Sequence, residues 1–294
     1  MRVSFFIAAS VGALALCACA TTPTADTVEP VVEVGAADTA LLQETIAARS
    51  DADKARDQWR HPAETLAFFG LTPDMTVVDA LPGRGWYTRI ILPVVAENGR
   101  YIGVNYQDGM WPLILPNPTP ELVDRLSNWT DTFPETTTDI AAPTTPVTAY
   151  EFGALPGDLD GEVDLVLMIR ALHNFNRAGG DFGEEALADA YRILKPGGVF
   201  GVVQHAAPAG AEGSAADGSN GYMSKAAVVE MAAAAGFVLE AESDINANPA
   251  DQPGADEIVW RLPPTYGLGD QDREIYAAIG ESNRMTLRFR KPAK

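Results

Sequence analysis

The pattern of apolar and polar residues divides most of the chain into strands that alternate with helices. The stretch EVDLVLMIR at 162–170 is almost continuously apolar, as expected of a parallel strand that is buried on both faces of a sheet. Shorter apolar runs occur at 76–79, 100–105 and 199–205. Between the runs, apolar residues recur at helical spacing, as they do at 184–194. The alternation predicts an α/β domain with a mainly parallel sheet.

The same pattern, together with turn residues, predicts the remaining elements. We expect one helix over 40–60 that ends before Pro62, because the residue before a proline avoids the helical conformation. A second helix then ends at Gly70. Further expected elements are a short helix around 121–129, a loop over 130–146, a strand at 147–152, a helix at 224–235 capped by Ser224, and strands at 237–243 and 286–292.

The stretch TVVDALPGRGWYT at 76–88 is the most informative part of the sequence. Its apolar start and its Pro/Gly cluster predict a buried strand that enters a tight turn, and a helical pattern follows. Glycines allow a ligand to approach the backbone closely, and a helix N-terminus offers free N–H groups. The turn is therefore either purely structural or a nucleotide-type cofactor site. A dinucleotide site would have Gly or Ala where this chain has Thr88.

The pattern acid-x-x-Pro-Gly-x-Gly over 79–85 resembles motif I of class I methyltransferases that depend on S-adenosyl-L-methionine (SAM). The run LKPGG at 194–198 is also similar to a feature of that family. The resemblance covers residues 51–292 and implies a Rossmann-like, seven-stranded, mostly parallel sheet with helices on both faces and an antiparallel last strand. Several stretches look like a group of exported bacterial predicted methyltransferases: HPAETLAFFGLTPDMTVVDALPGRGWYT, LHNF, QHAAP, AESDINANPAD and LRFRKP.

The resemblance implies SAM as the cofactor and suggests which residues bind it. In this family the second strand normally ends in an acid that binds the ribose hydroxyls. This chain has Asn105 there, with Asp108 three residues later, and an amide lacks the paired acceptors of a carboxylate. Trp86 and Tyr87 either contact the sulfonium of the cofactor by cation–π interaction or pack in the protein core without contacting it. The expected cofactor-binding residues are Asp79, Pro82, Gly83, Gly85, Trp86, Tyr87, Asn105, Asp108 and Arg170.

Three histidines are the candidates for catalysis. Ligands of open α/β sheets bind at the carboxyl ends of the strands, where the pattern places His173 and His205. We expect both to face one pocket, with residues 210–222 and part of 246–285 closing over it, and a general base among them to have a pKa near neutrality. His61 is a third candidate, although any of the three could be structural. Asn174 and Phe175 are expected to contact the acceptor.

Composition and the absence of certain motifs exclude other kinds of site. The 294 residues carry a formal charge of −19 with a pI near 4.4, which argues against nucleic acid as a partner and against adsorption to anionic lipid. We expect no metal, because the sequence has no Cys/His cluster or carboxylate array. The glycine turn has Arg84 where a hydrolase elbow would have its nucleophile.

The N-terminal stretch MRVSFFIAASVGALALCACA is typical of a secretory signal. Its end, LCAC, resembles a bacterial lipobox with Cys19 as the acylated residue; simple cleavage before Thr21 is the alternative. Both cysteines of the chain lie in this stretch. We therefore expect a signal peptide at 1–18, a flexible tether at 19–39 and a methyltransferase-like domain at 40–294. The expected location is the cell envelope, as a periplasm-facing lipoprotein or as a soluble periplasmic or secreted protein.

Together these features predict SAM-dependent methyl transfer to a small molecule or an envelope component, with the membrane contacted only through the lipid anchor. An exported binding protein that kept this fold without catalysis is the alternative, since Asn105 replaces the expected acid. A NAD-linked oxidoreductase is disfavoured by Thr88 and by Asn105. The oligomeric state stays open.

Overall fold

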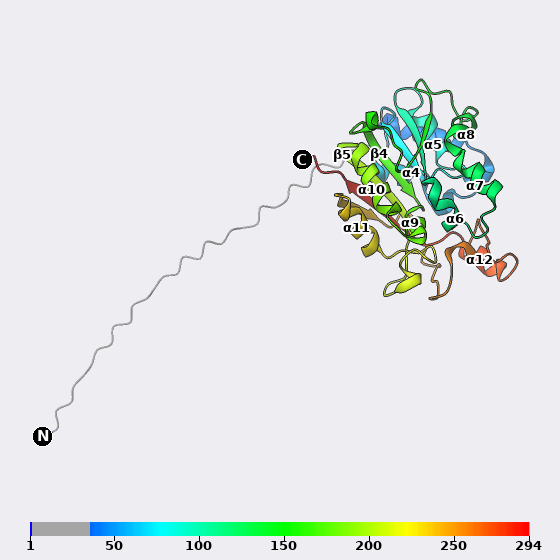
Figure 1. The fold of residues 1–294 in the computed structure, drawn as a ribbon, viewed down its shortest axis with the longest axis vertical. Coiled ribbons are helices and arrows are strands. Elements are labelled where there is room, and N and C mark those ends of the chain that lie inside the picture. The colour runs from blue at the N-terminus through cyan, green and yellow to red at the C-terminus, as the bar shows by residue number, and fades with distance from the viewer. Residues whose placement is uncertain (2–35, 294) are drawn as a thin grey trace. The chain divides into compact units, whose positions relative to one another are not determined.

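A seven-stranded sheet forms the centre of the computed structural model, which describes residue 1 and residues 36–293 (Figure 1). The strand order is β3-β2-β1-β4-β5-β7-β6. Strands β1 to β5 pair in parallel, and β7 runs antiparallel to both β5 and β6, which confirms the predicted sheet. The strands are β1 Thr76–Ala80, β2 Arg100–Asn105, β3 Thr148–Glu151, β4 Val163–Ile169, β5 Leu194–His205, β6 Val238–Ser243 and β7 Arg284–Arg290.

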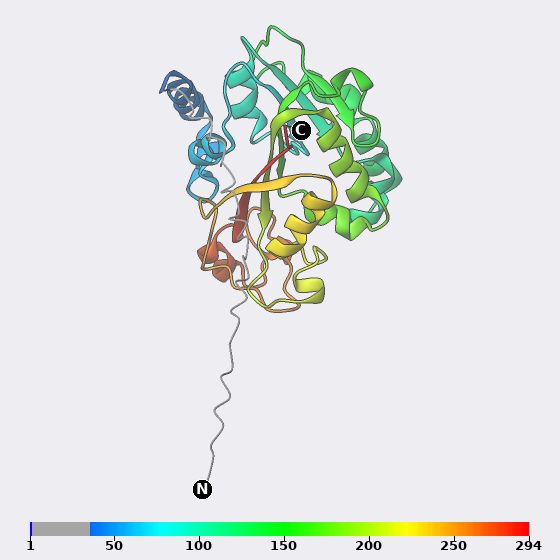
Figure 2. The same ribbon diagram turned by 90° about the vertical axis from the view of Figure 1, so that its left-hand side faces the viewer.

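Helices cover both faces of the sheet, as predicted (Figure 2). Ser224 caps α11 by accepting a hydrogen bond from the Ala227 N–H, and Gly70 ends α4 in the left-handed conformation. The helices are α1 Ala36–Ala48, α2 Asp51–Lys54, α3 Asp57–Arg60, α4 Pro62–Phe69, α5 Thr88–Val95, α6 Trp111–Ile114, α7 Pro120–Ser127, α8 Trp129–Thr136, α9 Leu172–Ala178, α10 Phe182–Ile193, α11 Lys225–Ala234 and α12 Arg273–Ile279.

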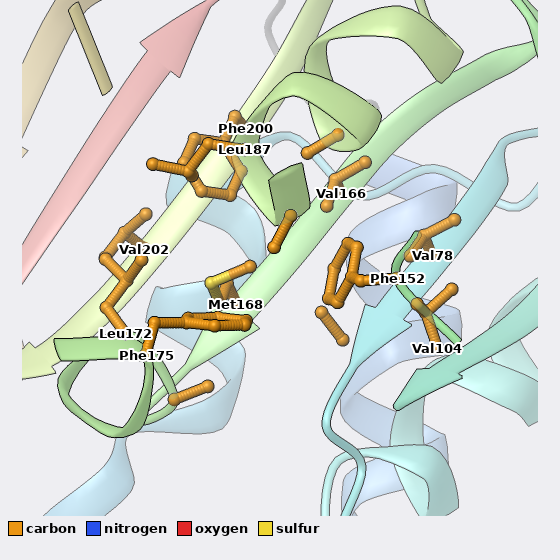
Figure 3. Close-up of a cluster of buried hydrophobic side chains, with 14 of the residues drawn as sticks. Val78, Val104, Phe152, Val166, Met168, Leu172, Phe175, Leu187, Phe200 and Val202 are labelled. Carbon is orange, nitrogen blue, oxygen red and sulfur yellow. The ribbon is translucent and has the colours of Figure 1, made fainter. Parts of the chain in front are cut away.

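Alternate residues of the central strands build two apolar cores, one on each face. The face under α9, α10 and α11 contains Val78, Val166 and Met168 (Figure 3). The opposite face, under α4 and α5, contains Val77 and Leu165. The side chains of a strand point alternately to its two faces, so the continuous apolar run of β4 supplies both cores.

Some predicted boundaries were wrong. The helix expected over 40–60 is three helices, because Ser50 adopts an extended conformation and its hydroxyl caps α2 by accepting from the Asp53 N–H. The expected loop over 130–146 begins with the rest of α8, which includes Pro134. The expected tether over 19–39 is wrong at its end, since α1 already begins at Ala36.

The two long connections after β5 and β6 gather at one end of the sheet in both views (Figures 1 and 2). A hydrogen bond from the Val259 N–H to the Asn220 carbonyl joins them. Within the part of the chain that the structure describes, no helix has both the length and the apolar character needed to cross a membrane. The signal peptide, Cys19 and most of the tether lie outside the described residues.

Candidate functional site

A cavity of about 390 Å³ lies at the carboxyl ends of the parallel strands. This is the edge where open α/β sheets bind ligands, and the volume suits a small molecule. Residues that follow or end β1, β2, β4 and β5 meet there with residues that precede β7. The lining consists of Arg56, Arg60, Leu81, Pro82, Gly83, Arg84, Trp86, Asn105, Tyr106, Trp111, Ile169, Arg170, His173, Asn174, His205, Val259, Trp260, Leu262, Pro263, Pro264, Thr265, Glu281 and Ser282.

The glycine turn contributes Pro82 and Gly83 to the cavity, but not Gly85. Gly83 has a φ of 58°, and a Cβ there would meet only one atom within 4 Å, the Leu81 carbonyl at 3.9 Å. A side chain at Gly83 would therefore extend into open space beside the lining. A Cβ at Gly85, which has a φ of 72°, would instead meet Arg89 at 3.3 Å and Thr88 at 3.5 Å. Gly85 shapes the start of α5, so its predicted cofactor contact is corrected to a structural role.

Asp79 lies in the interior instead of the cavity, which corrects its predicted cofactor contact. Its carboxylate accepts hydrogen bonds from the Tyr101 hydroxyl at 2.7 Å and the Thr88 hydroxyl at 3.2 Å. Burial raises the pKa of Asp79 to about 6, although both hydrogen bonds act to lower it. Thr88, which occupies the position where a dinucleotide site would have Gly or Ala, thus links the first turn of α5 to Asp79 of β1 and to Tyr101 of β2.

The two aromatic residues after the turn differ in their positions. Trp86 lines the cavity, but two guanidinium groups already lie against its ring, Arg49 at 4.8 Å and Arg60 at 4.6 Å from the centroid. The predicted sulfonium wall is therefore occupied by the protein's own cations. Tyr87 is buried against the edge of Trp86, and its hydroxyl is 3.5 Å from the Arg60 carbonyl oxygen. Tyr87 is core packing, and its predicted cofactor contact is corrected.

Asn105 ends β2 at the cavity with 5% of its surface exposed, as the second-strand position requires. Asp108 lies outside the lining and faces Glu151 at the end of β3. Burial and the neighbouring Asp108 carboxyl raise the pKa of Glu151 to about 7. The structure therefore corrects the position expected for Asp108 and leaves Asn105 as the polar side chain that β2 offers to the cavity.

His173 and His205 lie in the same cavity, with ring centroids 5.3 Å apart. His173 Nδ1 is 3.3 Å from the amide of Gln204, whose Nε2 donates to the Gly221 carbonyl. His205 Nδ1 is 2.6 Å from the Ser282 hydroxyl. Each imidazole is thus held through Nδ1, and the shared-pocket geometry expected from the strand ends is present.

Both histidines are neutral at physiological pH. Burial lowers the pKa of His173 to about 4, and the nearby Arg177 and Arg170 add to that effect. Burial lowers the pKa of His205 well below its usual range, and His173 and Arg170 lower it further. The expectation of a near-neutral pKa for a general base was therefore wrong, because burial and the neighbouring arginines disfavour protonation of either imidazole.

Arg170 belongs to a group of arginines around one carboxylate, that of Glu281. Arg60 donates to both oxygens of Glu281 at 3.1 and 3.0 Å, and Arg56 donates to Oε1 at 2.7 Å. Arg284 and Arg170 approach Oε2 at 3.3 and 4.0 Å. These charges lower the pKa of Glu281 to about 2 against the opposing effect of burial.

The roof of the cavity comes from residues 259–265, as part of the predicted closure over 246–285. A buried cluster fixes it: Arg261 pairs with Asp251 at 2.8 Å and donates to the Tyr222 hydroxyl at 2.7 Å. Tyr222 in turn donates to Asp251. The loop 210–222 supplies none of the described lining residues, so its predicted role as a lid is corrected to that of a support behind His173.

Three further predicted residues have other positions. His61 is not among the described lining residues. It connects α3 to α4 in the left-handed conformation, with a φ of 38°. Asn174 lines the cavity, but its amide already donates to the Tyr106 hydroxyl and accepts from Arg177. Phe175 is 2% exposed and lies in the core near Met168, so its predicted acceptor contact is wrong (Figure 3).

The residues present fit the cofactor that the motif implies, in part. Gly83 leaves room where a Cβ would intrude, and Asn105 presents an amide at the end of the neighbouring strand. Pro82 and Gly83 would lie under the amino-acid part, and Asn105 would face the ribose. The chemistry that SAM supplies when bound is a methyl group on a sulfonium.

Comparison with known proteins bears on the fold. No protein-family model and no curated protein matches the sequence. A solved SAM-dependent methyltransferase from Aquifex aeolicus is 15% identical, with a TM-score of 0.50 over 85% of this chain and 98% of the other. A putative sarcosine dimethylglycine methyltransferase from Galdieria sulphuraria gives 16% identity and a TM-score of 0.49 over 85% and 90% of the two chains. At this identity the comparison shows a common fold, so the chain has the Rossmann-like fold found in the Aquifex enzyme.

Proposed function

We propose that the protein is a SAM-dependent methyltransferase that acts on a small molecule. The observation that carries this proposal is one cavity in which the glycine turn after β1 and Asn105 of β2 meet two histidines at the ends of β4 and β5. In this proposal the cofactor lies beside the glycine turn and the acceptor lies beside the imidazoles. The fold shared with the Aquifex methyltransferase agrees with this assignment by analogy, and the functional assignment rests on the cavity.

The chain's own residues would orient the acceptor and exclude water. Because Nδ1 of each imidazole is engaged, Nε2 is the atom left to contact an acceptor from His173 or His205. With Nδ1 protonated and donating to Gln204 Oε1 or to the Ser282 hydroxyl, Nε2 of each neutral ring would accept a hydrogen bond or a proton from the acceptor's nucleophilic group. A pKa of about 4 makes His173 a weak base, so positioning is its larger contribution.

Calorimetric titration of the full-length chain with S-adenosylhomocysteine tests the proposal. We expect binding to the unaltered protein and at least tenfold weaker binding to Gly83→Val, whose side chain would occupy the cavity. Gly161→Val is the matched control, because Gly161 has a similarly positive φ of 72° but lies outside the cavity. Absence of binding to the unaltered chain, or equal binding to Gly83→Val, would refute the cofactor site.

A second candidate is a ligand-binding protein without catalysis. It is favoured by Asn105 in place of the expected acid and by the low pKa of both histidines. A single-turnover measurement with radiolabelled methyl donor and extracts of small metabolites separates the two. Donor binding without any labelled product would favour the binding protein.

We also propose that the protein is exported to the cell envelope and acylated at Cys19, on the basis of the apolar N-terminal stretch and the LCAC sequence. Intact-mass measurement of membrane-extracted protein tests this. We expect a chain that begins at Cys19 with the mass of added acyl groups, and Cys19→Ser should release the protein from membranes. A mature chain that begins at Thr21 without lipid contradicts acylation.

A further inference from the structure

The cavity has a strong positive charge in a chain that is otherwise acidic. Four arginines line it, and Glu281 is the one acidic residue among its described lining residues, which leaves a formal excess of three positive charges. The whole chain carries −19. The arginines therefore create a local field of the opposite sign, which attracts small anions into the cavity.

The arginines have more donor groups than Glu281 can satisfy. Glu281 already contacts Arg56, Arg60, Arg170 and Arg284 with two oxygens. Among the described residues, Arg60 Nη1 and Arg170 Nε are buried without a hydrogen-bond partner. Water does not reach Arg60 easily, because only 1% of its surface is exposed. A buried donor without an acceptor is costly, so these two N–H groups favour a further hydrogen-bond acceptor from outside the chain.

The position of the arginines places the group that would accept these hydrogen bonds in the half of the cavity near β4. Gly83 lies in the turn after β1, and Asn105 is the last residue of β2. Arg170 follows β4, which pairs with β1 on the side away from β2. The His205 ring is close to Ser282, the neighbour of Glu281. If the cofactor occupies the half at β1 and β2, Arg170 faces the half that remains for the second substrate.

We propose that the methyl acceptor is a small molecule with a carboxylate or phosphate group, which binds Arg60 and Arg170 beside Glu281. This inference rests on the proposed function. Guanidinium groups bind both kinds of anion through paired N–H donors, so the shared chemistry is an oxyanion. A second possible source of this chemistry is the carboxylate of the cofactor itself.

The experiment titrates the full-length chain with succinate and with inorganic phosphate, before and after saturation with S-adenosylhomocysteine. We expect at least one anion to bind equally well in both states, and neutral succinamide to bind at least tenfold more weakly. Arg170→Gln should lose at least tenfold in anion affinity, about 1.4 kcal/mol, and keep its affinity for S-adenosylhomocysteine. Arg125→Gln, an exposed arginine of α7 outside the cavity, is the control and should change neither affinity.

The outcomes separate this inference from the proposed function. Failure of both anions to bind, while S-adenosylhomocysteine binds, overturns the anionic acceptor alone. Loss of anion binding after S-adenosylhomocysteine saturation assigns the arginines to the cofactor's carboxylate and also overturns it. Anion binding without S-adenosylhomocysteine binding refutes the acceptor role together with the proposed function. A fall in succinate affinity with added sodium chloride, measured on the unaltered chain, supports the site without any variant.

Discussion

The buried carboxylate of Asp79 gives a prediction whose size can be derived from the structure. Asp79 has a pKa of about 6 in the folded chain, against 3.8 for the free side chain, so burial disfavours its ionised form. The difference of about 2 pKa units corresponds to about 3 kcal/mol. Because an acid with a raised pKa binds its proton more tightly when folded, stability is highest below pH 3.8, falls as the pH rises to about 6, and stays reduced above it.

Asp79→Asn should therefore stabilise the protein at pH 8 and have little effect at pH 4. The amide oxygen can still accept the hydrogen bonds of Tyr101 and Thr88, while the ionised form is no longer possible. We expect the free energy of unfolding of the variant, relative to the unaltered chain, to increase by about 2 kcal/mol between pH 4 and pH 8. Urea unfolding of both proteins across this range measures the difference.

The control for this prediction is Asp74→Asn, which removes an exposed carboxylate just before β1. Subtracting its effect removes the general consequence of losing one negative charge. A stability difference for Asp79→Asn that does not depend on pH, or a loss of stability at pH 8, would show that burial does not control this carboxylate. Loss of S-adenosylhomocysteine binding in a folded Asp79→Asn protein would show instead that Asp79 contacts the cofactor.

Two further predictions concern the histidines and the roof. If turnover needs neutral His173, activity should decline only as the pH falls toward about 4, because the pKa of His173 is lowered in the folded chain. A rate–pH profile should therefore show no step near 6.5. A step near neutrality that disappears in a His173 variant would contradict this prediction. Arg261→Met should destabilise the fold by about 3 kcal/mol or more, because it leaves the buried Asp251 carboxylate without its partner, whereas the double variant Arg261→Met with Asp251→Asn should recover much of the loss. Thermal unfolding measures both proteins, and equal losses in the single and double variants would refute the charge argument.

The sheet and much of the cavity edge follow from local sequence patterns. The apolar runs of β1, β2, β4 and β5 are long enough to identify the strands, and parallel pairing brings their carboxyl ends together. This is why the positions of His173 and His205 in the sequence predict one shared pocket. Alternation along β1 also gives Asp79 the same face as Val77, toward α5, so its burial could have been predicted from the same pattern.

The arginine cluster could not be predicted in this way. Arg56 and Arg60 belong to a segment whose charges suggest a solvent-facing side, and Arg60 is nevertheless among the most buried side chains. Its partner Glu281 lies 221 residues away in the sequence. A pairing over that separation depends on how the insertion before β7 folds, and no local period indicates it. The same reason explains why the roof residues around Trp260 were expected only as part of a long segment.

Two strained residues mark the cavity independently of any motif. Leu81 and Arg170 directly follow β1 and β4, which are neighbouring strands, and both have the left-handed conformation, with φ values of 61° and 58°. Each also donates its N–H to the next strand, Leu81 to Val104 and Arg170 to Val203. Glycine would adopt this conformation without strain, whereas another residue costs about 1–3 kcal/mol. The chain bears that cost at two adjacent strand ends whose side chains line the same cavity. Such strain persists only where the surrounding structure holds it, and at Arg170 it presents a guanidinium to the cavity. Arg170 thus combines a strained backbone with an unsatisfied donor at the end of β4, in the half of the cavity that remains for the second substrate, and Arg170→Gly should relieve the strain and weaken anion binding together.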